Sequence, residues 1–481
     1  MPCGFGRSQG ERTMSNGKDN WRLAYHLMPP DGWLNDPNGL CQADGTYHIY
    51  FQYAPNTPAP DGRMARTWGH YAGPDLVHLQ FEGVPFWPET ADRDGCYSGS
   101  AVVQNGEICL FYTGNIKHAG DYDYICDGRE SNTILVKTGD GKEYGEKKVL
   151  FGTKDYPEHC TRHVRDPKVW RENGVWYMVL GARMDDDSGA LLFYESGNLT
   201  DWKLLKIVST AKPFGYMWEC PDYFTVDGQS VISLCPQGLK SEEFRFENLY
   251  QSGYFPVSGD IRGAQSFKPF REWDFGFDFY APQSFEDESG RRILIGWSGM
   301  PDHPYENPTA GRGWENALTV PRVLHFRNGI VTQTPVPELE ELRSKEQIIS
   351  PEGRLTLPEA AGDIEIRFPE YRFIETGSWK IEIGDGVCLS YFNQILTLNL
   401  SGKTGRGRVE RKVRAAKITD ARLLIDRSML EFYFNGGEIV MTSHYFPDFE
   451  EDSHLEVRFD CSEAEITAWE MKPLPVNEQY F

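Results

Sequence analysis

The sequence predicts an all-β fold, in which a five-bladed β-propeller is followed by a C-terminal β-sandwich. Three observations lead to this prediction. The 481-residue chain is rich in turn residues, with 48 Gly and 30 Pro. In the first 330 residues, a turn ending in glycine followed by an apolar, strand-like stretch returns five times. After about residue 350, short alternating stretches dominate, which is typical of a sandwich.

The repeats are marked by glycines that lie 54 to 68 residues apart. This spacing exceeds the ~40–50 residues of familiar propeller repeats and leaves room for four strands and long loops. The glycines and the strands predicted after them are Gly45 with Thr46–Tyr53, Gly106 with Glu107–Thr113, Gly174 with Val175–Gly181, Gly228 with Gln229–Cys235, and Gly290 with Arg291–Trp297. Such units pack radially around a central channel.

Three carboxylates lie at the same place in this repeat, at nearly the same distance before the glycine of their unit. Asp36, Asp166 and Glu219 each lie eight or nine positions before the glycine of their unit, and Ser98 and Ala281 hold this place in the other two units. If the strand at this position is the innermost of each blade, the three carboxylates converge at one mouth of the channel. The alternative, that Asp-Pro pairs only cap strands, does not account for the recurrence.

The local environments suggest different roles for two of these carboxylates. Paired carboxylates ~5–5.5 Å apart are the equipment of retaining glycosidases, one as nucleophile and one as general acid. The apolar neighbours of Glu219, which are Trp218 and Cys220, disfavour charge and suit the acid. Asp36 lies in a turn beside Asn35, where it is expected to stay ionised and to serve as the nucleophile.

Several motifs together resemble glycoside hydrolase family 32, the invertases and fructan hydrolases. They are Trp33–Leu40, Tyr97–Ala101, Arg165–Pro167, Trp218–Pro221 and, in the second domain, Leu424–Glu431. The resemblance covers nearly the whole chain after the first twenty residues. It implies that Asp36 attacks the anomeric carbon of a terminal fructofuranoside, that Glu219 is the acid/base, and that Asp166 stabilises the transition state through the fructose hydroxyls.

The resemblance also implies a set of substrate-binding residues. They are Asn35, Gln52, Trp68, Ser98 and Arg165. Arg165 is expected to keep the adjoining Asp166 ionised. The chain departs from the family pattern at Tyr97, where phenylalanine is usual, and in the Pro-rich loop Asn56–Met64 before Trp68. Trp297 and Trp314 are candidates for stacking on the second sugar, although either could belong to the core.

Composition excludes several classes of function. The formal charge of −22, without a Lys/Arg cluster, argues against a nucleic-acid partner. No 18-residue apolar run predicts a membrane span, and the first twenty residues lack the apolar core of a secretory signal, so a cytoplasmic protein is expected. The ten cysteines contain no Cys-x-x-Cys pair and are predicted to be free thiols.

No cofactor or metal is expected. His159, Cys160 and His163 would need a helix to converge on a metal, and no fourth ligand is evident. Asp185–Asp187, followed by Ser188 and Gly189, favours a solvated hairpin turn over a calcium site.

Composition shifts divide the chain into four expected parts. Residues 1–20 are polar and are expected to be a disordered extension. Residues 21–334 are expected to form the propeller, and residues 335–350 a helix-like linker bounded by prolines. Residues 351–481 are expected to form the sandwich. The oligomeric state stays open.

The expected activity is that of a retaining β-fructofuranosidase acting on a small-molecule fructoside, either sucrose or sucrose 6-phosphate, through a fructosyl-enzyme. A fructo-oligosaccharide or fructan exo-hydrolase, or a fructosyltransferase, would share all three carboxylates; an inactive sugar-binding protein is a more remote alternative. Cations for a phosphate could come from loops, with candidates Arg63, Arg66, Lys240, Arg245 and Arg312, none of which the sequence assigns.

Overall fold

The computed structural model describes residues 19–56, 62, 66–263, 265–369, 378–449 and 454–480. The regular secondary structure of these residues consists almost entirely of antiparallel strands, which confirms the predicted all-β class. Short 3-10 turns supply the helical part: η1 (Thr90–Asp92), η2 (Thr153–Asp155), η3 (Pro308–Arg312), η4 (Pro337–Leu342) and η6 (Pro475–Tyr480). Among the described residues, no helix has the length and apolar character needed to cross a membrane.

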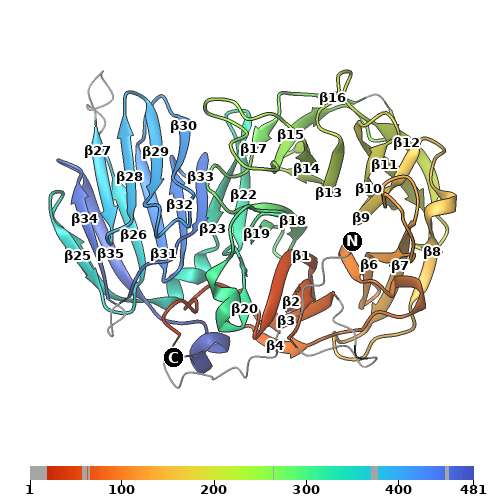
Figure 1. Cartoon of the computed structure of the whole chain (residues 1–481), viewed down its shortest axis with the longest axis horizontal. Helices are drawn as coiled ribbons and strands as arrows, with labels where there is room; N and C mark the ends of the chain where they lie inside the picture. The colour runs from red at the N-terminus through yellow and green to blue at the C-terminus, as the bar shows by residue number, and fades with distance from the viewer. Residues whose placement is uncertain are drawn as a thin grey trace.

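Five antiparallel sheets, numbered here sheets 1 to 5, follow one another along the chain (Figure 1). Sheet 1 contains β1 (Gly32–Ala43), β2 (Thr46–Ala54), β3 (Thr67–Gly73) and β4 (Gln80–Gly83). Sheet 2 contains β5 (Cys96–Gln104), β6 (Glu107–Lys117), β7 (Arg129–Thr138) and β8 (Lys148–Phe151). Sheet 3 contains β9 (Cys160–Glu172), β10 (Val175–Met184), β11 (Gly189–Ser196) and β12 (Lys203–Val208).

Sheets 4 and 5 complete the series. Sheet 4 contains β13 (Met217–Val226), β14 (Gln229–Gln237), β15 (Gly253–Ser258), β16 (Ser266–Phe267) and β17 (Arg271–Glu272). Sheet 5 contains β18 (Tyr280–Glu286), β19 (Arg292–Ser298), β21 (Ala317–Leu318), β22 (Arg322–Arg327) and β23 (Ile330–Pro335). The short β20 (Trp314–Glu315) returns to sheet 1, where it pairs in parallel with β1.

The five strands predicted after glycines are found as the second strands of the five sheets. β2, β6, β10, β14 and β19 each begin within one residue of the predicted start. The glycines lie in hairpin turns with positive φ, for example 77° at Gly45 and 83° at Gly290, a conformation that glycine adopts without a steric penalty.

The first strands of the five sheets lie next to one another in a closed circle. β1 contacts β5, β5 contacts β9, β9 contacts β13, β13 contacts β18, and β18 returns to β1. Figure 1 shows the sheets spread around this centre. Residues on the first strands are therefore brought together from parts of the chain more than 200 positions apart.

Each first strand carries the same irregularity, a β-bulge in which two residues oppose one on the second strand. The bulged pairs are Asn35–Asp36, Tyr97–Ser98, Asp166–Pro167, Cys220–Pro221 and Ala281–Pro282. Three of these residues take a positive φ, including 64° at Asp166 and 46° at Cys220. Strain of this kind persists only where the surrounding structure holds it, and it gathers at functional sites.

The bulge corrects the equivalence predicted from spacing. Asp36 and Ser98 are the second residues of their bulges and Asp166 is a first residue, whereas Glu219 is the last paired residue before its bulge. The three carboxylates thus occupy successive register positions rather than one. They still face one cleft because a bulge redirects the side chains around it.

The C-terminal part is a sandwich of two six-stranded sheets, as predicted. Sheet 6 contains β24 (Arg343–Ile349), β35 (Glu465–Met471), β26 (Ala361–Arg367), β31 (Asp420–Asp426), β32 (Met429–Phe434) and β33 (Ile439–His444). Sheet 7 contains β25 (Arg354–Leu357), β34 (Leu455–Asp460), β27 (Trp379–Ile383), β28 (Val387–Phe392), β29 (Ile395–Leu400) and β30 (Glu410–Arg414). An apolar core that includes Leu389, Leu423 and Phe432 fills the space between the sheets.

The stretch 335–350, expected as a linker, is divided between η4 and β24. β24 pairs with β35 and belongs to sheet 6. Arg343, at its start, forms an ion pair of 2.8 Å with the buried Asp363. The sandwich therefore takes in most of the second half of this stretch.

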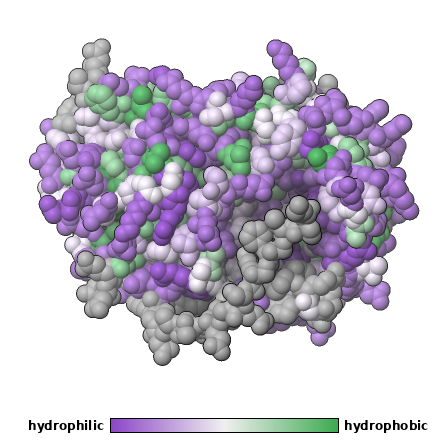
Figure 2. All heavy atoms as spheres, viewed as in Figure 1, coloured by the Kyte–Doolittle hydropathy of each residue, from purple (hydrophilic) through white to green (hydrophobic). Residues whose placement is uncertain are grey.

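The face of the molecule shown in Figure 2 is mostly hydrophilic, over both the sandwich and the five sheets, with small scattered hydrophobic patches. This distribution agrees with the formal charge of −22.

A buried polar network joins the sandwich to the first sheets. Asp426 accepts backbone hydrogen bonds from Ala24 (2.6 Å) and Tyr25 (2.9 Å), and an ion pair of 2.8 Å from His26. Glu431 binds the other ring nitrogen of His26 at 2.9 Å. Both acids belong to the motif Leu424–Glu431, so this motif anchors residues 24–26 to the sandwich.

Arg322 extends the network into sheet 5. It donates to Glu431 at 2.6 Å, and both side chains are fully buried. Burial opposes the charged form, but hydrogen bonds to Asp426 and Glu431 raise the pKa of His26 to about 9. Burial likewise raises the pKa of Glu431, but Arg322 and His26 outweigh it and lower that pKa to about 2.

These shifts predict how stability depends on pH. Because the pKa of His26 is raised in the folded state, protonated His26 adds to the free energy of unfolding. This stabilisation is complete below about pH 6.5 and is lost as the pH rises through about 9. His26→Gln is expected to lower the free energy of unfolding by about 3 kcal/mol and to flatten the loss of thermal stability between these pH values. His78→Gln, which alters an exposed pair with Asp75, is the control. An unchanged alkaline loss in His26→Gln would contradict this account.

Candidate active site

A cleft of about 680 Å³ opens where the first strands meet. Asp36, Asp166 and Glu219 all line it. Below them a second space of only about 10 Å³ is lined by residues from all five first strands, so the cleft has a closed floor. The structure thus brings together the three carboxylates that the repeat predicted to converge.

Asp36 is held at both carboxylate oxygens. The Asn35 side-chain amide donates to Oδ1 at 3.1 Å, and the Ser98 hydroxyl donates to Oδ2. The Cys220 thiol lies 3.6 Å from the same Oδ2. Burial raises the pKa of Asp36, whereas the hydrogen bonds from Ser98 and Asn35 lower it and Glu219 raises it again. This carboxylate is therefore fixed in orientation, and its pKa lies above the ordinary value.

Asp166 lies deeper, at the positive-φ position of its bulge. Its Oδ2 accepts the backbone N–H of Cys220 at 2.9 Å, and the Cys220 thiol lies 3.7 Å away. Burial raises the pKa of Asp166 to about 7, with Arg165 acting against the rise and Glu219 adding to it. The expectation that Arg165 keeps Asp166 fully ionised is therefore not met, because burial is the larger effect.

Glu219 accepts four hydrogen bonds. Arg165 donates to Oε1 from Nε (3.0 Å) and Nη2 (2.7 Å), while Gln237 and the Tyr280 hydroxyl each donate to Oε2 at 2.7 Å. The apolar setting expected from Trp218 is wrong, because neighbouring residues on a strand point to opposite faces and Trp218 packs into the core. Glu219 faces a polar, strongly donating environment.

Four of the five predicted substrate-binding residues line the cleft: Asn35, Gln52, Ser98 and Arg165. Asn35, Gln52 and Ser98 are connected by hydrogen bonds, with the Gln52 side-chain oxygen accepting from both of the others. They form a polar wall beside Asp36.

Trp68 is not brought to the cleft. Its side chain is fully buried in an aromatic cluster with Tyr50, Phe86 and Tyr112. Its indole N–H donates to the carbonyl of Tyr97 at 3.0 Å, so it supports the bulge next to Ser98 from behind. The prediction that Trp68 lines the pocket is not supported because its side chain points into the core between sheets 1 and 2.

The two tryptophans that were candidates for stacking on the second sugar lie in different places. Trp297 lines the cleft and contacts Trp33 edge to face at 6.0 Å. Trp314 is buried in a cluster with Leu23 and Met28, and its indole donates to Asp19.

Sequence reasoning assigned no role to Gln237 and Tyr280, although both bind Glu219. Tyr280 is the last paired residue before the bulge of β18, as Glu219 is in β13, but this equivalence is visible only once the strands are paired. No feature of the sequence distinguishes Gln237, which reaches Glu219 from the end of β14.

The candidate cations for a phosphate are scattered. Arg66 is exposed and lines the cleft. Arg245 pairs with Glu272, and Arg312 pairs with Asp19. Lys240 is exposed and does not line the cleft. Arg63 lies outside the described residues.

The histidines considered for a metal have other partners. His159 is exposed and pairs with Asp185 at 3.0 Å, whereas the Nδ1 of His163 accepts from Arg165 at 2.7 Å. They flank the start of a strand rather than sharing a helix face. Asp185 to Asp187 lie in the hairpin between β10 and β11, as expected.

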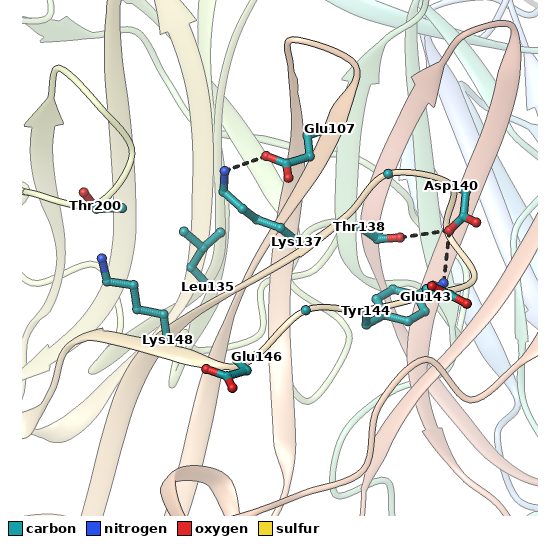
Figure 3. Close-up of a pocket in the computed structure, with 12 residues that line it drawn as sticks. Glu107, Leu135, Lys137, Thr138, Asp140, Glu143, Tyr144, Glu146, Lys148 and Thr200 are labelled. Carbon is teal, nitrogen blue, oxygen red and sulfur yellow. Dashed lines mark hydrogen bonds and ion pairs between the residues drawn. The ribbon is translucent and has the colours of Figure 1, made fainter.

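A larger cavity, of about 810 Å³, lies on the outer side of sheet 2 (Figure 3). Lys137 donates there to Glu107 at 2.6 Å, and the Thr138 hydroxyl contacts Asp140. Figure 3 shows these groups pairing with one another rather than pointing jointly into the cavity. None of the three carboxylates lines it, so we exclude it as the site of the chemistry.

Comparison with known families decides which one the chain belongs to. The model of the glycosyl hydrolases family 32 N-terminal domain matches residues 26–335, well over half of the chain. The chain belongs to glycoside hydrolase family 32. The model of the family 32 C-terminal domain matches residues 396–471, within the sandwich.

Curated relatives of this family 32 chain are similar over nearly its whole length. The sucrose-6-phosphate hydrolase of Bacillus subtilis is 37% identical over 446 residues, covering 89% of this chain and 90% of the relative. The raffinose invertase of Escherichia coli is 37% identical over 455 residues, covering 91% and 92%.

Solved structures of family 32 proteins share the fold. The sucrose-6-phosphate hydrolase of Lactobacillus gasseri has a TM-score of 0.84 at 26% identity, covering 95% of this chain and 94% of that one. A β-fructofuranosidase of Bombyx mori, solved in complex with sucrose, has a TM-score of 0.81 at 26% identity, covering 94% of both chains.

Proposed function

We propose that the chain is a retaining β-fructofuranosidase that hydrolyses sucrose or sucrose 6-phosphate. The observation that carries the proposal is the meeting of Asp36, Asp166 and Glu219 in one cleft, each with different hydrogen-bond partners. The relatives named as sucrose-6-phosphate hydrolase and raffinose invertase support the substrate class.

We propose that sheets 1 to 5 are the blades of a five-bladed β-propeller over residues 21–334, followed by the sandwich, which begins with β24. The closed circle of contacts among the first strands supports the propeller, since radially packed blades place their inner strands around one axis. In this arrangement the bulges lie at one mouth of the axis.

Asp36 is the proposed nucleophile. A nucleophilic carboxylate must keep a fixed orientation toward the anomeric carbon, and hydrogen bonds from Asn35 and Ser98 to opposite oxygens supply it. Attack by one oxygen forms the fructosyl-enzyme bond while the bond from the anomeric carbon to the leaving oxygen breaks.

Glu219 is the proposed acid/base. It gives a proton to the leaving oxygen in the first step and takes one from water in the second. Arg165 stabilises the carboxylate that remains after the first step, which is the form needed as a base.

Asp166 is the proposed transition-state stabiliser, binding fructose hydroxyls from the depth of the cleft. Asn35, Gln52, Ser98 and Arg165 are the proposed substrate-binding residues that surround it. Trp68 supports this wall from the core rather than touching substrate.

Transfer to methanol tests the proposal. With sucrose as donor and methanol as co-solvent, the enzyme is expected to release glucose and to form methyl β-D-fructofuranoside, because two successive displacements retain configuration. NMR of the product identifies the anomer. The α-anomer would contradict double displacement. An enzyme that cleaves neither sucrose nor sucrose 6-phosphate would contradict the proposed activity.

A further inference from the structure

One half-buried guanidinium group of the cleft is paired with no carboxylate. Four guanidinium groups line the cleft, those of Arg66, Arg129, Arg165 and Arg183. Arg165 is paired with Glu219 at 2.7 Å and Arg183 with Asp187 at 2.6 Å, whereas Arg66 is exposed. Within the described parts of the chain, Arg129 is half-buried and forms no ion pair with a carboxylate, in a chain whose net charge is −22.

Arg129, the first residue of β7, is held in place without being saturated. Its Nη1 lies 3.4 Å and 3.5 Å from the two ring nitrogens of His163. Its Nε is buried and has no hydrogen-bond partner among the described residues. Arg129 therefore keeps hydrogen-bonding capacity that its neighbours in the structure do not use.

His163 acts as a neutral spacer in this cluster. Its Nδ1 accepts from Arg165 Nη1 at 2.7 Å. Burial lowers the pKa of His163, and Arg165, Arg129 and Arg183 lower it further, to about 3. The ring therefore adds no charge at neutral pH and keeps Arg129 apart from Arg165.

The remaining groups near the cluster do not cancel the charge of Arg129. Asp123 also lines the cleft, but it is exposed and accepts the backbone N–H groups of Ile125 and Cys126 at 2.8 Å each. Tyr97 also lines the cleft and contributes a phenol rather than a carboxylate.

The cluster is also connected to Glu219, the proposed acid/base. A continuous set of contacts runs from Glu219 through Arg165 and His163 to Arg129. Arg183 packs over the Tyr216 ring at 4.8 Å, and its bonds to Asp187 use Nε and Nη2, which leaves Nη1 to face a ligand.

We propose that Arg129, assisted by Arg183, binds the phosphate monoester on the leaving glucosyl unit of sucrose 6-phosphate. The inference rests on the proposed function, in which Glu219 protonates the oxygen of that leaving unit. Two guanidinium groups offer the forked donors that phosphate oxygens accept.

Arg129→Gln tests the proposal against Arg66→Gln, which removes an exposed charge from the same cleft. kcat/KM is measured for sucrose 6-phosphate and for sucrose. The ratio of the two values is expected to fall about 10-fold or more in Arg129→Gln, because a charge-assisted hydrogen bond is lost, and to change little in Arg66→Gln. An unchanged ratio in Arg129→Gln, or an equal fall in Arg66→Gln, would overturn the proposal.

Product inhibition gives a second readout. The inhibition constant of glucose 6-phosphate is expected to rise about 10-fold in Arg129→Gln, while that of fructose stays the same. If both constants rise together, the residue acts on the cleft as a whole and the proposal fails. Should Arg129→Gln not fold, as judged by its thermal midpoint, Arg129→Lys takes its place, with a smaller fall in the ratio expected because one ammonium cannot replace a fork of donors.

Different results would contradict the proposed activity and the proposed phosphate site. A wild-type enzyme that cleaves neither substrate contradicts the proposed function. A wild-type enzyme that cleaves sucrose, with no change of ratio in Arg129→Gln, contradicts only the phosphate site.

Discussion

Asp36→Asn is expected to lower kcat for sucrose by about 10⁴-fold or more while leaving the fold intact. The substitution removes the attacking carboxylate but keeps a side chain of the same shape between Asn35 and Ser98. Because burial raises the pKa of Asp36, the charge is costly to hold, and its removal is not expected to destabilise the protein. Steady-state kinetics and thermal denaturation of the same preparation check both statements.

Asp302→Asn is the matched control for this substitution. Asp302 lines the same cleft, and its contact is with the Tyr250 hydroxyl at 3.2 Å. It is expected to affect kcat far less. Azide offers a sharper test: with Asp36→Ala and an activated fructoside, azide attacks from the vacated face and yields the α-fructosyl azide. A β-configured azide would place the nucleophile elsewhere.

Glu219→Gln is expected to lower kcat/KM for sucrose by about 10²–10⁴-fold, the usual contribution of general acid catalysis. A fructoside with a good leaving group, such as the p-nitrophenyl compound, needs little protonation in the first step and is expected to lose much less there. Rapid mixing should show a burst of nitrophenol followed by slow turnover, because the second step still lacks its base.

Equal losses on the two fructosides would remove Glu219 as the acid. The control is Gln237→Ala, which removes one of the donors to Glu219 without removing the carboxylate. This variant is expected to affect both substrates to a similar extent, because it changes the setting of the acid rather than the presence of a proton donor.

The strand pattern could be predicted because its causes are local. A glycine with positive φ and an alternating apolar stretch define each hairpin, and β2, β6, β10, β14 and β19 begin within one residue of the prediction. The sandwich was predicted from the same kind of pattern, but its division into two six-stranded sheets was not. The extra strand β24 was missed because the prolines before it suggested a linker.

The bulges could not be predicted from local sequence. Their residue pairs share no common composition, since they include Asn35–Asp36, Tyr97–Ser98 and Cys220–Pro221. Spacing from the glycines therefore located the three carboxylates to within one position but could not give their register. A bulge becomes visible only when both paired strands are known.

Contacts between sheets were the other part that the sequence could not supply. Arg165 was expected to serve its neighbour Asp166, but its guanidinium reaches from β9 to Glu219 on β13 because the two first strands lie side by side. The resemblance implied that Trp68 binds substrate, and Trp314 was a candidate either for stacking or for the core; both side chains point into the core.

The account depends most on the claim that Asp36 carries the sugar during turnover. Glu219→Gln, quenched in acid while it processes the activated fructoside, should hold the intermediate, and peptide mass spectrometry can locate it. The expected result is a single hexosyl residue, a hexose less one water, on the carboxylate of Asp36. Labelling of Asp166 or of any other residue, or no label during a clear burst, would contradict the proposed mechanism.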